Sequence, residues 1–150
     1  MLVKFKLNGI DVKYDVEPGE FLLDTLRAHN IKSLKKGCDG SACGVCAVLL
    51  DGKPVLSCSV LSLTVEGHEV TTVEGIQDVA SKIADCFALE GADQCGYCNA
   101  AISLVIYAMS KELKDPSDEE IKKYLVGSLC RCTGYQSQVK ATKRYLGGLK

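Results

Sequence analysis

The cysteines are the residues whose number and spacing point most directly to chemistry. Nine cysteines occur among 150 residues, in a chain with 47% hydrophobic residues. Such a chain can bury a hydrophobic core without disulfides, and its clustered thiols more often bind metal than form a disulfide framework. Eight cysteines fall into two groups and one stands apart: Cys38, Cys43, Cys46 and Cys58; Cys95, Cys98, Cys130 and Cys132; and Cys86 alone. Two groups of four predict two metal sites.

The segment LCRCTGY, residues 129–135, places Cys130 and Cys132 with one residue between them. A disulfide at that spacing would be strained, because the bridge needs a particular Cα separation and converging Cβ vectors.

The first ten residues, MLVKFKLNGI, alternate like a half-buried strand and lack the continuous apolar stretch of an export signal. We therefore expect a cytoplasmic protein, in which thiols stay reduced and bind metal.

The loop KKGCDGSACGVC, residues 35–46, is the strongest motif of the first half. Its C-x4-C-x2-C spacing, followed by a fourth thiol at Cys58, is the arrangement of plant-type two-iron ferredoxins. Gly37, Gly40 and Gly44 would let the loop adopt positive φ angles and direct backbone N–H groups at sulfur. The alternative is a flexible surface loop, but four thiols at the spacing of a two-iron ferredoxin favour a rigid, ligated loop.

The elements around this loop predict a small mixed sheet packed by one helix. Asn8-Gly9 and Asp51-Gly52 are dipeptides typical of tight hairpin turns, and each lies between two alternating or β-rich segments. The predicted strands are 2–7, 10–16, 45–50, 53–58 and 68–73, and the predicted helix is 20–30. The thiol loop thus connects the helix to the third strand.

The second half changes to helical periodicity near residue 75. A helix is predicted where Ile76, Val79, Ile83 and Phe87 recur on one face. The next helix, residues 100–113, is apolar on nearly every side and is expected at the centre of a bundle, with Asn99 as its cap. Ser117 and Glu120 form a capping-box pattern for a third helix, and a fourth is expected at about 136–146. Cys86 is expected to act as a small buried hydrophobe.

The thiols of the second group lie at the ends of these helices. The segment QCGYC, residues 94–98, precedes the apolar helix, and residues 129–135 lie between the last two helices. Folding can therefore bring both pairs of thiols to one end of the bundle. A two-iron cluster needs two thiolates on each iron, so the close pair Cys130 and Cys132 could supply one iron.

With these motifs the chain resembles the small iron–sulfur subunit of the molybdenum hydroxylases, the family of xanthine dehydrogenase, aldehyde oxidoreductase and carbon monoxide dehydrogenase. The resemblance covers nearly the whole chain through GCDGSACGVC, Cys58, QCGYC and GSLCRCTGY. It implies an α+β fold, with a plant-type ferredoxin-like (β-grasp) domain at 1–75 and a four-helix-bundle-like [2Fe-2S] domain at 76–150.

The resemblance also implies which residues hold which cofactor. The cluster farther from molybdenum would be held by Cys38, Cys43, Cys46 and Cys58, and the nearer one by Cys95, Cys98, Cys130 and Cys132. Gln94 and Cys132 match residues that contact the molybdopterin of a large subunit, where substrate is hydroxylated. Electrons would leave through both [2Fe-2S] clusters to FAD on a medium subunit, in a hetero-oligomer such as a dimer of heterotrimers. The chain itself would hold no catalytic residue.

Two departures from the family pattern lie near the second thiol group. Asn99-Ala100-Ala101 stand where Thr-Pro-Gly is usual, and Ser128 stands where Asn is more usual. Asn can cap a helix as Thr can, and the loss of Pro removes a pre-set φ but no ligand. The departures therefore concern the contact with the large subunit rather than the cluster.

Other classes of function fit the sequence less well. Eighteen basic and nineteen acidic residues are dispersed, so no nucleic-acid surface is expected, and no apolar run is long enough to span a membrane. Phosphate-loop and Ser-His-Asp patterns are absent, so we expect no nucleotide or flavin on this chain. Two alternatives to the electron-transfer subunit remain: a free-standing two-cluster ferredoxin, and a structural protein with two four-thiolate zinc sites. The C-x-C pair fits zinc poorly, and the match at Gln94 disfavours a free ferredoxin.

Overall fold

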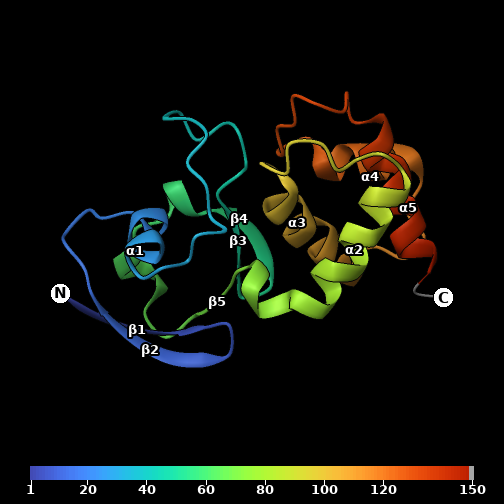
Figure 1. Cartoon of the computed structure of the whole chain (residues 1–150). Coiled ribbons are helices and arrows are strands. Elements are labelled where there is room, and N and C mark those ends of the chain that lie inside the picture. Colours follow the sequence, from blue (N-terminus) through green and yellow to red (C-terminus); the bar gives the residue numbers. More distant parts are fainter. Residues whose placement is uncertain (149–150) are drawn as a thin grey trace.

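The first half of the chain forms a five-stranded mixed sheet with one helix, α1 (Leu22–Ala28), packed against it (Figure 1). The structure is a computed structural model and describes residues 1–148. The strand order is β2-β1-β5-β3-β4, and the β1–β5 pair is parallel whereas the other neighbours are antiparallel. The strands are β1 (Leu2–Leu7), β2 (Ile10–Asp15), β3 (Ala47–Leu50), β4 (Lys53–Leu56) and β5 (Glu69–Thr71).

Both hairpin predictions are confirmed. Asn8 and Gly9 have φ angles of 53° and 80°, and Asp51 and Gly52 have 50° and 81°. Positive φ at both central residues is the type I′ geometry, whose twist matches that of the strands. These turns fix the register, so alternate residues of β1 face inward and join the leucines of α1 in one core.

Helices α2 (Gln77–Leu89), α3 (Asn99–Glu112), α4 (Asp118–Leu125) and α5 (Gln136–Gly147) form the second half. As expected from its apolar composition, α3 is the buried one, and it lies against α2, α4 and strand β3. Figure 1 shows the helices gathered on one side of the sheet. No helix within residues 1–148 is long and apolar enough to cross a membrane.

The start of α3 differs from the prediction that Asn99 caps it. Cys98 occupies the N-cap position, and Asn99 is the first helical residue. The Asn99 side chain instead donates a hydrogen bond to Asp93 Oδ1 at 2.8 Å. It therefore closes the loop that carries Gln94 and Cys95 onto the helix rather than capping the helix.

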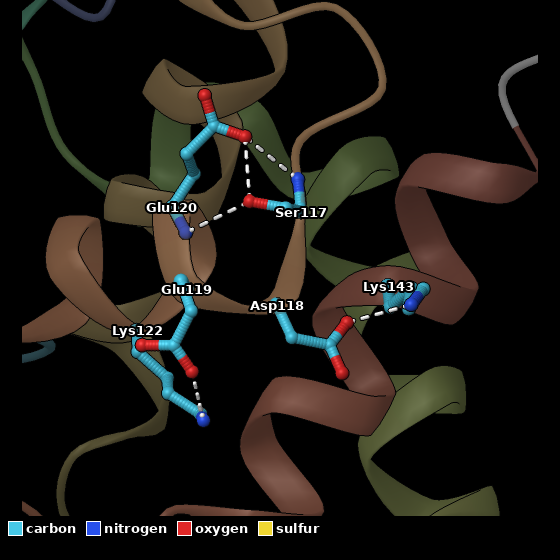
Figure 2. A network of polar contacts seen from close by, with 6 residues as sticks. All are labelled: Ser117, Asp118, Glu119, Glu120, Lys122 and Lys143. Atoms are coloured by element: carbon cyan, nitrogen blue, oxygen red, sulfur yellow. Dashed lines mark hydrogen bonds and ion pairs between the residues drawn. The ribbon is translucent and has the colours of Figure 1, made fainter.

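The predicted capping box at the start of α4 is confirmed (Figure 2). Ser117 Oγ accepts from the Glu120 N–H at 3.3 Å, and Glu120 Oε2 accepts from the Ser117 N–H at 2.8 Å. Lys143 on α5 pairs with Asp118 at 2.6 Å, which ties α5 to the same end of α4. Helices α4 and α5 thus hold both ends of the loop that contains Cys130 and Cys132.

Glu74 anchors the segment between the two halves. Its carboxylate accepts hydrogen bonds from Thr72 Oγ1 at 2.5 Å and from Ser33 Oγ at 2.9 Å. Burial opposes the charged form, but these two donors and the backbone N–H groups of Glu74 and Ser33 together outweigh it and lower the pKa of Glu74. Because Ser33 lies just before the first thiol loop, Glu74 fixes the position at which that loop begins.

Candidate metal centres

The four thiols of the first group come together at the sheet end of the loop 35–46. Cys43 and Cys46 are buried, and Cys38 and Cys58 are half-buried. The Sγ atoms of Cys46 and Cys58 lie 3.3 Å apart, and the thiols of Cys38 and Cys43 hydrogen-bond to each other. The group therefore consists of two contacting pairs, as four ligands shared between two irons require.

Backbone N–H groups of the loop point at Cys38. The Ala42 N–H donates to Cys38 Sγ at 3.4 Å, and the N–H groups of Cys43 and Gly40 also contribute. These donors hold the pKa of the Cys38 thiol at about 7, which favours the thiolate that binds metal. In contrast, burial raises the pKa of Cys46 to about 11, so its ionisation depends on a bound cation or cluster.

The loop glycines have three different roles. Gly44 has the expected positive φ, at 74°, and Ser41 also adopts a left-handed conformation, at 53°. Gly37 is required by close packing instead, because a Cβ there would lie 2.9 Å from Val45 Cγ2 and 3.1 Å from Cys43 Sγ. Gly40 faces open space. The expectation of positive φ at all three glycines is therefore correct only for Gly44.

The second thiol group is assembled from the two segments predicted for it. Cys98 and Cys130 are buried and hydrogen-bond to each other, whereas Cys95 and Cys132 are exposed and form the other pair. The backbone N–H of Tyr97 lowers the pKa of Cys95, and burial raises that of Cys98 to about 12. Each contacting pair takes one thiol from each segment.

This pairing differs from the expectation that Cys130 and Cys132 serve one iron together. The C-x-x-C and C-x-C segments lie side by side, so each thiol faces a thiol of the other segment rather than its own neighbour. The short C-x-C spacing thus brings two separate pairs next to each other.

The second thiol group opens into a cavity of about 250 Å³. All four of its thiols line the cavity, together with Arg131, Tyr97 and Cys43 of the first group. A smaller hollow of about 100 Å³ lies beside Cys38 and Cys58. Within residues 1–148, no three His, Cys, Asp or Glu side chains are arranged to hold a single ion. Paired thiols beside hollows of this kind fit a two-iron cluster in each half.

Direct contacts hold the two thiol groups together. The Leu129 N–H donates to the Cys43 carbonyl at 2.8 Å, and Tyr97 Oη donates to the Lys36 carbonyl at 3.1 Å. Gly44 lies against the backbone of Gly127. Figure 1 shows the loop of the first group (cyan) and the loop before α5 (orange-red) on the same upper side of the molecule. The first group is therefore docked on the loop that supplies half of the second.

The remaining predicted residues lie as follows. Gln94 is exposed, and its Nε2 donates to the Gly91 carbonyl at 3.2 Å. Cys132 is exposed on the same side of the second thiol group as Cys95, its partner. Cys86 lies away from both groups, half-buried against the helical core, where burial raises its pKa. The prediction of a small buried hydrophobe is thus met only in part, because Cys86 packs against the core but is not fully buried.

Sequence reasoning missed Gln138. This side chain on α5 is fully buried, and its Nε2 lies 3.7 Å from Cys98 Sγ. The available signal was its spacing from Thr142 and Tyr145, which places it on the inward face of α5. Nothing local indicates that this face meets a ligand thiol.

The chain matches two family descriptions in sequence order. Residues 5–72 match "2Fe-2S iron-sulfur cluster binding domain", and residues 72–143 match "[2Fe-2S] binding domain". The two matches meet between β5 and α2, so each contains one complete thiol group.

Full-length relatives carry both parts. The nicotinate dehydrogenase small FeS subunit of Eubacterium barkeri is 38% identical over 95% of this chain and 92% of its own length. The xanthine dehydrogenase iron-sulfur-binding subunit of Escherichia coli O157:H7 is 37% identical over 89% of this chain and 87% of its own.

Solved structures share the fold. A chain of quinoline 2-oxidoreductase from Pseudomonas putida 86 superposes with a TM-score of 0.90 at 32% identity, over 99% of this chain and 94% of its own. The aldehyde oxidoreductase of Desulfovibrio desulfuricans gives 0.92 at 32% identity over 99% of this chain, although only 17% of that longer chain is covered. The α+β fold is thus shared with both enzymes.

Proposed function

The chain belongs to the small iron–sulfur subunits of the molybdenum hydroxylase family, and we propose that it links a molybdopterin site on a large subunit to FAD on a medium subunit. It is an electron-transfer subunit of a molybdenum-dependent oxidoreductase. The observation that carries the proposal is the meeting of eight thiols in two adjacent groups. A [2Fe-2S] cluster supplies one-electron chemistry when bound, and the chain's task is to hold two of them in fixed relation.

We assign the eight ligands by their contacts. Each iron would take the two thiols of one contacting pair, so Cys130 and Cys132 would serve different irons. The lowered pKa of Cys38 and the contact of every one of the eight thiols with another thiol of its group support ligated rather than free thiols. The proposed pairs are Cys38 with Cys43, Cys46 with Cys58, Cys95 with Cys132, and Cys98 with Cys130.

The division into domains follows the two thiol groups. We infer a plant-type ferredoxin-like (β-grasp) domain at 1–75 and a four-helix-bundle-like domain at 76–150. The strand order and the lone helix α1 support the first, and the packing of α3 against α2 and α4 supports the second. Their shared boundary lies in the segment that Glu74 anchors.

We propose that the second thiol group is the one that faces the large subunit. Gln94 and Cys132 are both exposed beside it, as residues that contact molybdopterin on another chain must be. Leu129 and Val126 nearby have 56% and 86% of their surface exposed, which suits an area that a partner covers. The first group would then face the FAD-binding subunit, in a cytoplasmic hetero-oligomer such as a dimer of heterotrimers.

The departure at Asn99 is compatible with this assignment. Its side chain holds Asp93, so the loop with Gln94 and Cys95 is closed without the usual Thr-Pro-Gly. The position of Gln94 is thereby fixed by a side-chain hydrogen bond in place of a proline. We expect the contact with the large subunit to tolerate the change.

The test is EPR spectroscopy and metal analysis of the anaerobically purified, reduced protein. We expect about four irons per chain and two distinct two-iron signals. Cys38→Ser should remove one signal and Cys132→Ser the other, whereas the matched control Cys86→Ser should keep both. Colourless protein with two zincs and no iron would support the structural alternative instead, and a single signal would refute the two-site assignment.

Purification from native cells tests the partners. We expect the chain to co-purify with a molybdopterin subunit and a flavin subunit, because it offers two sets of cluster ligands and exposes Val126 and Leu129 beside the second thiol group. A stable, molybdenum-free monomer carrying both clusters would instead identify a free-standing ferredoxin.

A further inference from the structure

The buried side chain of Gln138 is a polar group that the eight thiol ligands leave unexplained. It has no exposed surface, and its Nε2 is 3.7 Å from Cys98 Sγ, within hydrogen-bonding distance for sulfur. Its Oε1 is the one buried side-chain oxygen or nitrogen within residues 1–148 that has no hydrogen-bond partner. A buried amide whose oxygen has no hydrogen-bond partner lowers the stability of the folded state.

An apolar side chain of similar length would avoid this cost. Cys98, which the amide contacts, belongs to a buried apolar cluster that also contains Ile102, Val139 and Ala141. The presence of an amide here is therefore not explained by packing. It is explained if the N–H group has a task at Cys98.

Ligation of Cys98 determines which end of the amide faces the sulfur. A metal-bound thiolate has no proton and can only accept a hydrogen bond. The Gln138 N–H must then point at Cys98 Sγ, and Oε1 must point away, where it lacks a partner. Thr142 Oγ1 donates to the main-chain carbonyl of Gln138 at 2.8 Å, an i to i−4 contact within α5 that does not involve the side-chain amide.

We propose that Gln138 is a positioning residue that raises the reduction potential of the second cluster through an N–H···S hydrogen bond to Cys98. A donor at a ligand sulfur stabilises the added negative charge of the reduced state more than it stabilises the oxidised state. The inference rests on the proposed function, because it takes Cys98 as a cluster ligand. It extends that function by naming a residue that tunes the potential of one of the two clusters.

Thr133 is a second donor to this thiol group and allows a comparison. Its Oγ1 donates to Cys130 Sγ at 3.3 Å, but from a half-buried loop position. Gln138 donates from the buried face of α5, where water cannot replace the lost donor. Removal of Gln138 should therefore have the larger effect.

The experiment is an EPR-monitored redox titration of the holoenzyme carrying Gln138→Leu. We expect the equilibrium constant for reduction of the second cluster to fall about tenfold, a shift of about 59 mV to lower potential for one electron. The first cluster should keep its potential. The melting temperature should not fall, because the substitution also removes the unpartnered Oε1.

Two further variants keep the test decisive. Gln138→Met has nearly the same length but no N–H to donate, so its shift should be in the same direction and of similar size. Thr142→Val is the matched control, since it removes a buried hydroxyl one turn away on α5 without touching the donor to sulfur. It should leave both potentials unchanged.

The outcomes separate this inference from the proposed function. Two normal signals with a second-cluster shift of less than twofold in both Gln138 variants would overturn the inference and leave the electron-transfer function standing. Equal shifts of both clusters, or the same shift in Thr142→Val, would also overturn it. Absence of two-iron signals in the unaltered protein would refute the function and the inference together.

Discussion

Replacement of Gly44 by alanine should break the docking of the first thiol loop on the second. Gly44 has φ +74°, and a Cβ on it would overlap the carbonyl oxygen of Gly127 and lie 3.0 Å from Cα of Ser128. The left-handed conformation costs a residue with a Cβ roughly 1–2 kcal/mol. Relief of the overlap requires backbone movement, which costs about 1–3 kcal/mol. Gly44→Ala should therefore lower the free energy of unfolding by about 2–5 kcal/mol.

The movement should also expose one particular amide. The Leu129 N–H is bonded to the carbonyl of Cys43, next to Gly44, so separation of the two backbones breaks this bond. Anaerobic guanidinium unfolding measures the stability, and hydrogen exchange followed by mass spectrometry measures protection of the peptide that contains Leu129. We expect a lower unfolding midpoint and faster exchange at that peptide.

Gly40→Ala is the matched control for this prediction. Gly40 lies in the same loop, has no atom within 4 Å of an added Cβ, and lacks a positive φ. Its stability should change by less than about 0.5 kcal/mol, as is usual for a surface substitution. If Gly44→Ala unfolds at the same midpoint as Gly40→Ala and keeps Leu129 protected, the two loops are not held together as described.

Substitutions at two further positions test the elements that position the loops. Ser117→Ala should destabilise the chain by about 1 kcal/mol in denaturant unfolding, because it removes the cap of α4, whereas Ser117→Thr should keep most of the cap; equal losses in both would contradict the capping role. Glu74→Gln should destabilise the chain at pH 7, and its difference from the unaltered protein should shrink as the pH falls through the lowered pKa of Glu74. The carboxylate contributes stability above its ordinary pKa and loses it on protonation, so a difference that grows on acidification would refute this account.

Local chemistry explains the parts of the fold that the sequence predicts well. The turns at Asn8-Gly9 and Asp51-Gly52 depend on φ preferences of two residues, and the capping box depends on Ser117 and Glu120 three positions apart. Such features need no knowledge of distant segments. The spacing of the cysteines likewise identifies the two thiol groups, because short spacings restrict which thiols can converge.

Features that depend on long-range packing could not be predicted from the sequence. The contact of Cys132 with Cys95 rather than with Cys130 depends on how two segments align after α3 and α4 have packed. Asn99 fits a cap by residue type, but Asp93 competes for its side chain once the loop closes. Gln138 meets Cys98 only because the first turn of α5 lies beside the residue that precedes α3. Each of these depends on a tertiary contact that periodicity does not encode.

Cys43 links ligation of the first group to the folding of the second half. Its thiol hydrogen-bonds to the thiol of Cys38, its side chain lines the cavity of the second group, and its carbonyl accepts a hydrogen bond from the Leu129 N–H. Each half has only about 75 residues and would bury roughly 60% of its unfolded surface alone. Metal binding at such sites contributes directly to folding free energy. Iron bound by the first group should therefore also stabilise the loop that carries Cys130, so the two sites are expected to load cooperatively although their ligands are separate.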